Sequence, residues 1–132
     1  MIQLAAFDID RILVSQTTGA IAPETVLALR QLRIKGIKTA IATGRQWQQV
    51  PKSLKQLDFD YYILLNGTHI TDSNGKTFHR EKISKENVLE LESDISGKDR
   101  TLYLRFEEGM YPVFERDRMT PFNLPKTKLS PT

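Results

Sequence analysis

Three short apolar runs in the first half of the chain are predicted to form β-strands. They occupy residues 4–7, 37–43 and 61–65. Their nearly continuous apolar character is typical of parallel strands that are covered on both faces, rather than of half-exposed hairpin strands. The connections between such strands are expected to be right-handed crossovers. The pattern therefore predicts an α/β domain at the start of the chain.

Helical periodicity between the runs places the connecting helices. Pro23 suits the first turn of a helix, and Glu24 is favourable near the positive end of the helix dipole. Gly36 is the expected C-cap of this helix. A second helical stretch is expected directly after the second strand, with a fresh helix from Pro51 to Leu57. Strands separated by helices in this way indicate a parallel sheet with flanking helices.

The pattern changes after the third strand. Segments 68–71 and 76–83 are predicted to form a β-hairpin, because an Asn-Gly pair between them favours a type I′-like turn. A helix with a serine N-cap is expected over 84–93. Two further strands are expected over 101–106 and 110–114.

The composition is that of an ordinary globular protein. Hydrophobic residues make up 39% of the 132 residues and charged residues 27%, which argues against a disordered chain. No apolar run approaches the roughly 18 residues of a membrane span, and the first residues lack the basic segment of a signal peptide. A cytoplasmic protein without a membrane partner is therefore expected. The absence of cysteine excludes disulfides, zinc–thiolate sites and cysteine nucleophiles.

The net charge gives no sign of a nucleic-acid partner. The chain has 19 basic and 16 acidic residues, a net charge of +3, and its aromatic residues are too scattered to form a stacking platform. Scattered solubilising charge is the simpler interpretation. The two histidines, His69 and His79, lack metal-ligand spacing and are expected at the surface.

Two carboxylates follow the first predicted strand. Asp8 and Asp10 are two residues apart, so both can face one side only if the chain turns as the strand ends. Close carboxylates without a partner repel each other, which favours a bound cation. Mg²⁺ prefers one or two carboxylates together with phosphate oxygens, and a carboxylate beside a phosphate can also be a nucleophile. Solvated acids at an ordinary strand-end turn are the simpler alternative.

Polar residues also follow the second and third predicted strands. Thr43, Gly44 and Arg45 stand between a strand and a predicted helix, where a hydroxyl and the backbone N–H groups of a helix start can bind phosphate. Arg45 can also hold an anion. Asn66 ends the third strand, and the carboxyl ends of neighbouring parallel strands meet where ligands bind. These residues are therefore expected to converge, although an ordinary N-cap and a turn are the simpler interpretations of each one alone.

Taken in order, the motifs resemble those of the haloacid dehalogenase (HAD) superfamily, and most closely its Cof-type sugar-phosphate phosphatases. The first family motif is DxDGT[LV], and residues 8–13 read DIDRIL. The second is a strand-end Thr, commonly within ATGR, and residues 42–45 read ATGR. The family's NGA-type segment is present as NGT over 66–68, and the hairpin pattern that follows it matches 70–76. The resemblance covers about residues 2–115.

The resemblance implies a fold in three parts. Residues 1–71 would be a partial Rossmann-like, HAD-type core with a parallel sheet and flanking helices. Residues 72–118 would be a hairpin and an incomplete α+β cap. Residues 119–132 form a Pro-rich stretch without periodicity, which is expected to be a tail.

The resemblance also implies a reaction, the Mg²⁺-dependent hydrolysis of a phosphate monoester through an aspartyl-phosphate. Asp8 would be the nucleophile and Asp10 the acid and base, and both would bind Mg²⁺. The substrate would be a small phosphorylated metabolite. The residues implied in holding its phosphate are Thr43, Gly44, Arg45 and Asn66.

Two departures from the family pattern favour an alternative. Arg11 and Ile12 replace the Gly and Thr of the first motif, and Arg adopts a positive φ less readily than Gly. The Arg11 side chain is expected either to contact an anion or to block the site. Nothing after residue 114 matches the motif-three Lys or the acidic metal loop of the family, so the Mg²⁺ site is expected to be weak or incomplete. The alternative is a degenerate, truncated HAD-like protein that binds or oligomerises without catalysis.

The early end of the chain also bears on partners. In the family, the strand that carries the acidic loop pairs beside the first strand. Without it, the first strand is expected to have an open apolar edge, and such edges recruit partners. A homodimer or a second chain is therefore expected to cover this edge.

Overall fold

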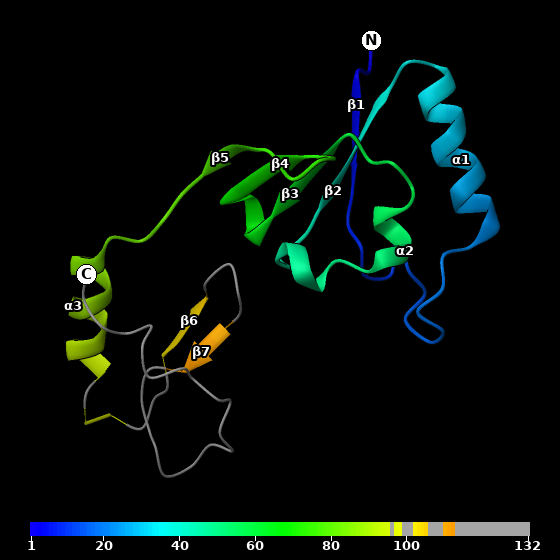
Figure 1. The fold of residues 1–132 in the computed structure, drawn as a ribbon. Helices are drawn as coiled ribbons and strands as arrows, with labels where there is room; N and C mark the ends of the chain where they lie inside the picture. Colours follow the sequence, from blue (N-terminus) through cyan, green and yellow to red (C-terminus); the bar gives the residue numbers. More distant parts are fainter. Residues whose placement is uncertain (96, 99–101, 106–109, 113–132) are drawn as a thin grey trace. The chain divides into compact units, whose positions relative to one another are not determined.

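The computed structural model describes residues 1–95, 97–98, 102–105 and 110–112. The chain forms two compact units, Met1–Lys82 and Ile83–Thr132 (Figure 1). All the candidate site residues belong to the first unit.

A mixed five-stranded sheet organises the first unit. Its strands are Leu4–Phe7 (β1), Lys38–Ala42 (β2), Tyr61–Leu64 (β3), His69–Asp72 (β4) and Thr77–Arg80 (β5). They lie in the order β1-β2-β3-β4-β5, with β1, β2 and β3 parallel and the β3–β4 and β4–β5 pairs antiparallel. The predicted parallel strands are confirmed, and the predicted hairpin extends the same sheet.

The hairpin turn differs from the type I′-like turn that the sequence predicts. Gly75 has a φ of 81°, but Asn74 does not adopt the positive φ that a type I′ turn also requires. Instead the Gly75 N–H donates to the Asp72 carbonyl over 3.1 Å, and the Asp72 N–H donates to the Lys76 carbonyl over 3.0 Å. The Asp72 carboxylate accepts the N–H groups of Asn74 and Lys76 at 2.8 and 2.9 Å, which stabilises the longer loop.

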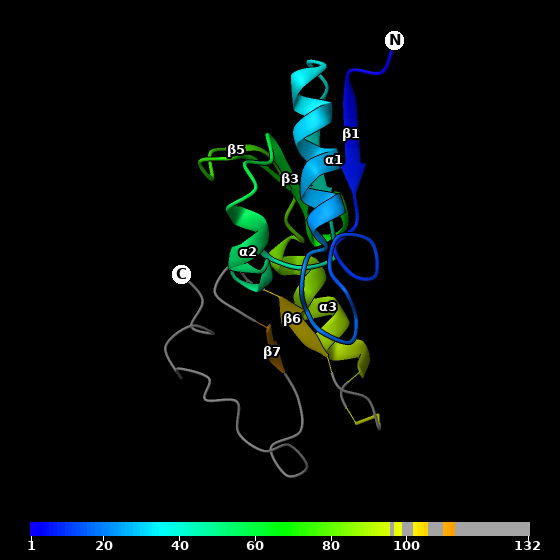
Figure 2. The ribbon, with the colours of Figure 1, turned by 90° about the vertical axis from the view of Figure 1, so that its right-hand side faces the viewer.

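Helical segments connect the parallel strands. Helix α1, Pro23–Ile34, begins at the predicted proline and lies against β2 (Figure 2). The second connection contains a 3₁₀ turn, Trp47–Gln49, and a short helix α2, Lys52–Lys55. This helix is shorter than the predicted Pro51–Leu57, and Asp58, which follows it, has a φ of 55°.

The core lies on one face of the sheet. Ile41 and Tyr62 are opposite each other in the β2–β3 register, and Leu64 follows Tyr62 by two residues, so the three side chains share a face. The other members of the core are Ile9, Leu13, Leu29, Val50, Leu54 and Phe59. Because both crossovers run in the same direction across the sheet, right-handed connections place α1 and α2 on this same face. The sequence predicted a sheet that is covered on both faces. The two described crossover helices instead lie on one face.

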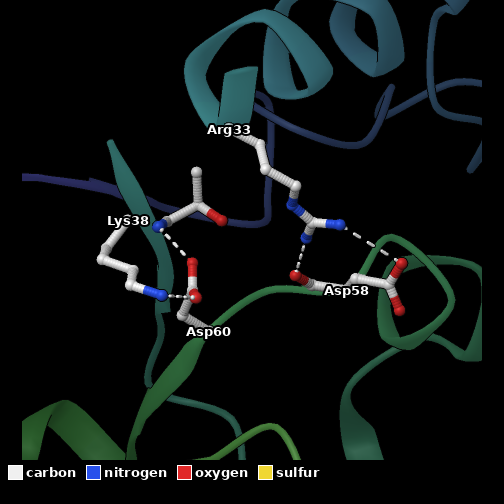
Figure 3. A network of polar contacts seen from close by, with 5 residues as sticks. Arg33, Lys38, Asp58 and Asp60 are labelled. Atoms are coloured by element: carbon white, nitrogen blue, oxygen red, sulfur yellow. Dashed lines mark hydrogen bonds and ion pairs between the residues drawn. The ribbon is translucent and has the colours of Figure 1, made fainter. Parts of the chain in front are cut away.

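A polar network joins the start of β2 to the start of β3 (Figure 3). The Asp60 carboxylate accepts the Lys38 ammonium at 2.8 Å and the Thr39 backbone N–H at 2.9 Å. Arg33 contacts both the carboxylate and the carbonyl of Asp58. Partial burial opposes the ionisation of Asp60, but the bonds from Lys38 and Thr39 outweigh it and hold its pKa below the ordinary 3.8. The same Asp60 contact raises the pKa of Lys38 above 10.5.

The second unit contains a helix and a strand pair. Helix α3 spans Lys85–Ile95, and the Ser84 hydroxyl accepts the Asn87 N–H at 3.2 Å, which confirms the predicted serine cap. Strands β6, Tyr103–Arg105, and β7, Met110–Pro112, pair in antiparallel fashion within the two predicted strand regions. The predicted tail lies outside the described residues. Among the helices that the structure describes, none is long and apolar enough to cross a membrane.

The Asp60 network predicts a pH dependence of stability. Because the pKa of Asp60 is lowered by folding, its ionised form stabilises the protein above the unfolded pKa of 3.8, and this contribution is lost as the pH falls through the lower folded value. We expect Asp60→Asn to lower the free energy of unfolding at pH 7, and the difference from wild type to shrink as the pH falls from about 5 to about 2. Urea unfolding followed by Trp47 fluorescence measures the free energy of unfolding of both proteins at each pH. A difference between them that is equal at every pH would contradict the stabilising role of ionised Asp60.

Candidate active site

A tight turn after β1 presents the two aspartates to solvent. The Ile9 carbonyl accepts the N–H groups of Leu13 and Val14 at 3.1 and 3.0 Å. The Ile9 and Leu13 side chains are buried in the core, so they fix the turn from below. Asp8 and Asp10, on either side of Ile9, are exposed. The chain therefore turns after this strand, as the sequence analysis expected if the two aspartates are to face one side. The buried side chains of Ile9 and Leu13 hold the turn in place.

Arg11 occupies the strained position of this turn. Its φ is 67°, in the left-handed region that favours glycine. The Arg11 N–H donates to the Val14 carbonyl at 3.2 Å, so the conformation is part of the turn's hydrogen bonding. Arg11 stands where the first motif in the Sequence analysis has Gly, and its backbone still adopts a conformation that favours Gly.

The loop after β2 does not open a helix at Gly44-Arg45, so this prediction was wrong. The Thr43 hydroxyl accepts the Arg45 N–H at 3.1 Å, and the Arg45 carbonyl accepts the Leu65 N–H at 3.1 Å. The second bond uses the Arg45 carbonyl, which a helix starting here would need, and the 3₁₀ turn starts only at Trp47. Thr43 itself is buried, with 8% of its surface exposed. A phosphate cradle at a helix start is therefore not the geometry of this loop.

The loop after β3 bonds directly to the loop after β2. Leu65 and Asn66 both adopt positive φ, 52° and 57°, and the Asn66 N–H donates to the Thr43 carbonyl at 3.2 Å. A Cβ atom on Gly44 would lie 2.9 Å from Asn66 Oδ1, so only glycine leaves the Asn66 side chain in place. Thr43, Gly44 and Asn66, which the sequence predicted to converge at one edge of the sheet, are thus brought together.

An ion pair connects the first loop to the second. Arg45 Nη2 lies 2.7 Å from Asp10 Oδ1, and Arg45 Nε lies 3.2 Å from Asp10 Oδ2. Arg45 Nη1 also donates to the Gln49 carbonyl at 3.0 Å. The guanidinium is therefore held from both sides, and both carboxylate oxygens of Asp10 accept a hydrogen bond from it. The sequence indicated Arg45 as an anion contact but gave no signal for Gln49 or Leu65, whose roles depend on backbone groups.

The donor set at this sheet edge suits a hard cation. Asp8 and Asp10 offer exposed carboxylate oxygens, and Mg²⁺ is commonly bound by one or two carboxylates with phosphate oxygens completing its shell. Within the described ranges there is no group of three or more Asp, Glu, His or Cys residues arranged for a metal. Asp8 and Asp10 are thus the two carboxylates at this edge that could contact a cation, and both oxygens of Asp10 already accept hydrogen bonds from Arg45.

Comparison with known sequences identifies a protein family. The family model of haloacid dehalogenase-like hydrolases matches residues 5–126. The HMP-PP phosphatase of Serratia proteamaculans is 27% identical over 130 residues, which are 98% of this chain and 44% of that protein. Phosphatase YwpJ of Bacillus subtilis is 28% identical over 113 residues, 85% of this chain and 36% of that protein. The chain thus spans less than half the length of these relatives.

Solved structures give the same result. A phosphatase of the HAD enzyme superfamily from Bacteroides thetaiotaomicron matches 92% of this chain and 43% of its own, with a TM-score of 0.80 and 26% identity. A HAD subclass IIB sugar phosphatase matches 82% of this chain and 42% of its own, with a TM-score of 0.67 and 28% identity. The fold class implied by the sequence motifs is confirmed, and the chain belongs to the family of haloacid dehalogenase-like hydrolases.

Proposed function

We propose that this chain carries the phosphoryl-transfer site of a Mg²⁺-dependent phosphatase. The observation that supports this most is that Asp8 and Asp10, Thr43, and Asn66 follow the carboxyl ends of the adjacent parallel strands β1, β2 and β3, where α/β sheets bind ligands. The Asn66 N–H bonds to the Thr43 carbonyl, and Arg45 joins Asp10 to the second loop. The relatives that match the chain are phosphatases by name. Because the chain spans less than half of their length, the complete activity is part of the proposal.

In the proposed reaction, Asp8 and Asp10 divide the chemistry. A carboxylate oxygen of Asp8 attacks phosphorus as the bond from phosphorus to the leaving oxygen breaks, and the Asp10 carboxyl gives its proton to that oxygen. Asp10 then takes a proton from water, the water oxygen attacks phosphorus, and inorganic phosphate leaves with Asp8 restored. Thr43 and Asn66 hold the phosphate at the loops that they join.

Arg45 controls when Asp10 can act. In the structure, the guanidinium donates to both oxygens of the Asp10 carboxylate, so Asp10 would have to give up part of this contact to reach a leaving oxygen. A guanidinium also matches the geometry of phosphate. An incoming phosphate therefore competes with Asp10 for Arg45, and the competition frees Asp10 as substrate arrives.

Asp8 and Asp10 are the residues proposed to hold Mg²⁺. When bound, the cation would offset the negative charge of the phosphate. Small phosphate monoesters are the proposed substrate class, because a phosphate group is the only part of a substrate that these loops can select. The remaining selectivity belongs to parts of the fold beyond this site.

A second candidate function is the binding of a phosphorylated ligand without turnover. The Asp10–Arg45 contact favours it, because the guanidinium already engages both oxygens of the Asp10 carboxylate. Arg11 adds a second cation beside the aspartates, where the family has an uncharged glycine.

The first test is hydrolysis of an aryl phosphate with and without Mg²⁺. We expect Asp8→Asn to reduce Mg²⁺-dependent hydrolysis to background, and Asp10→Asn to lower it by about 10² to 10⁴-fold, the usual contribution of a general acid. Asp58→Asn is the matched control, because it removes a carboxylate that is 78% exposed and lies outside the site. Activity that survives in Asp8→Asn would contradict the proposed nucleophile. A folded wild-type chain that shifts the ³¹P signal of phosphate but has no activity would favour the second candidate.

The strained turn gives a separate stability prediction. We expect Arg11→Gly to raise the free energy of unfolding by about 1 kcal/mol, because glycine removes the cost of a Cβ at positive φ. Arg11→Ala is the control, since it removes the guanidinium but keeps the Cβ. Urea unfolding measures both variants. Equal stabilisation by the two would show that the side-chain charge, and not the backbone, causes the effect.

A further inference from the structure

Arg45 has an acceptor that does not belong to Asp10. Its Nε and Nη2 atoms donate to the Asp10 carboxylate, whereas Nη1 donates to the Gln49 carbonyl at 3.0 Å. An arginine side chain can adopt many rotamers, so each bond to a fixed acceptor narrows where its guanidinium can lie. The Gln49 carbonyl is a backbone group, and the turn that carries it sets its place. The direction of the Arg45 guanidinium therefore depends on this turn.

Gln49 ends the 3₁₀ turn Trp47–Gln49 and is bonded back to Gln46, the residue before that turn. The Gln49 N–H donates to the Gln46 carbonyl at 2.9 Å, and the Gln46 N–H donates to Gln49 Oε1 at 3.2 Å. The N–H groups at the start of a helical turn have no acceptor within the turn, and a Gln side chain three residues later can supply one. The Gln49 side chain thus closes the turn onto Gln46.

Buried residues flank the turn, but Gln49 itself is exposed. Gln46 and Val50 are only 7% and 2% exposed, and Val50 belongs to the core cluster. The Val50 N–H also donates to the Trp47 carbonyl at 3.2 Å. Because Gln49 is exposed, its side chain fills no space in the core. The side chain therefore acts on the turn through its hydrogen bond and not through packing.

We propose that Gln49 is a positioning residue of the candidate active site. Its side chain holds the 3₁₀ turn in place, and its carbonyl holds Arg45 Nη1, so the guanidinium stays directed toward Asp10. The effect of this anchor on phosphate rests on the proposed function. The placement of Arg45 does not, because it is a property of the chain without a ligand.

The anchor matters most when a phosphate arrives. In the proposed exchange, Arg45 gives up oxygens of Asp10 for oxygens of the phosphate. The Gln49 carbonyl takes no part in this exchange, so it keeps the guanidinium at the site while its other partner changes. Without the anchor, part of the binding free energy would be needed to order the Arg45 side chain. Loss of the Gln49 side-chain bond is therefore expected to weaken phosphate binding.

Gln49→Met is the informative variant, and Gln48→Met is its matched control. Methionine keeps the length of the glutamine side chain but removes the oxygen that accepts the Gln46 N–H. Gln48 lies in the same 3₁₀ turn and is also exposed, so the control makes the same chemical change one residue away from the anchor. A difference between the two variants therefore reports the Gln49 bond and not the general stability of the turn.

The first measurement needs no ligand. In ¹H–¹⁵N spectra, the Nε–H signal of Arg45, identified by its loss in Arg45→Lys, reports how fast this proton exchanges with water. We expect exchange in Gln49→Met to be about three- to tenfold faster than in wild type, the usual effect of losing one hydrogen bond. Exchange in Gln48→Met should match wild type. Unchanged exchange in Gln49→Met, or equal effects of the two variants, would overturn the proposal.

Amide exchange on the wild-type chain tests the turn without a substitution. Because the Gln46 N–H donates to Gln49 Oε1, we expect this amide to exchange more slowly than an unprotected one. An unprotected Gln46 amide would also overturn the proposal, because the Gln49 side chain would then not close the turn.

Phosphate binding separates the positioning role from the proposed function. We expect the dissociation constant of inorganic phosphate, measured by ³¹P NMR with Mg²⁺ present, to rise about three- to tenfold in Gln49→Met and to stay unchanged in Gln48→Met. In aryl phosphate hydrolysis the KM should rise with little change in kcat, because Arg45 would hold the phosphate equally in the ground and transition states. Faster Nε–H exchange with unaltered phosphate binding would support the positioning of Arg45 and contradict its proposed contact with phosphate.

Discussion

The candidate site depends on hydrogen bonds between the loops that follow β2 and β3. The Asn66 N–H bonds to the Thr43 carbonyl and the Leu65 N–H bonds to the Arg45 carbonyl. Both donors come from residues with positive φ, a conformation that costs non-glycine residues free energy. The buried side chains beneath, such as Leu64, hold the strands in register and offset this cost. These two bonds, together with the bond from the Thr43 N–H to the Ile63 carbonyl, join the second and third loops, so the polar residues after the two strands lie close together.

The Asp10–Arg45 ion pair connects this framework to the first loop. Its charges are partly exposed, with 58% and 37% of the side-chain surface accessible, so solvent screening keeps its contribution to global stability small. Its importance is local, since it fixes the direction of the Asp10 carboxylate and ties the first loop to the Gln49 carbonyl. Because the contact adds little to global stability, the proposed exchange of Asp10 for a phosphate at Arg45 would not require the chain to unfold.

Local signals in the sequence were sufficient for the elements but not for their contacts. The apolar run over 4–7 and the proline at position 23 predicted β1 and the start of α1, because burial and a fixed φ act within a few residues. The helix expected at Gly44-Arg45 does not form, because its backbone groups bond to the loop that follows β3. The approach of Asn66 to Gly44 and the pairing of Arg45 with Asp10 depend on strand register, which no local pattern contains. The residue types at the site and their meeting at one sheet edge could be predicted from the sequence, and the individual bonds between them could not.

The covalent role of Asp8 is the central claim, and trapping its phosphorylated form tests it most directly. The chain would be incubated with Mg²⁺ and acetyl phosphate, quenched with borohydride, and digested for peptide mass spectrometry. Borohydride reduces an acyl phosphate to an alcohol, so the account predicts conversion of the Asp8 side chain to that of homoserine, and none at Asp10. A folded chain that binds phosphate but shows no reduction at Asp8, or reduction at another carboxylate, would contradict it.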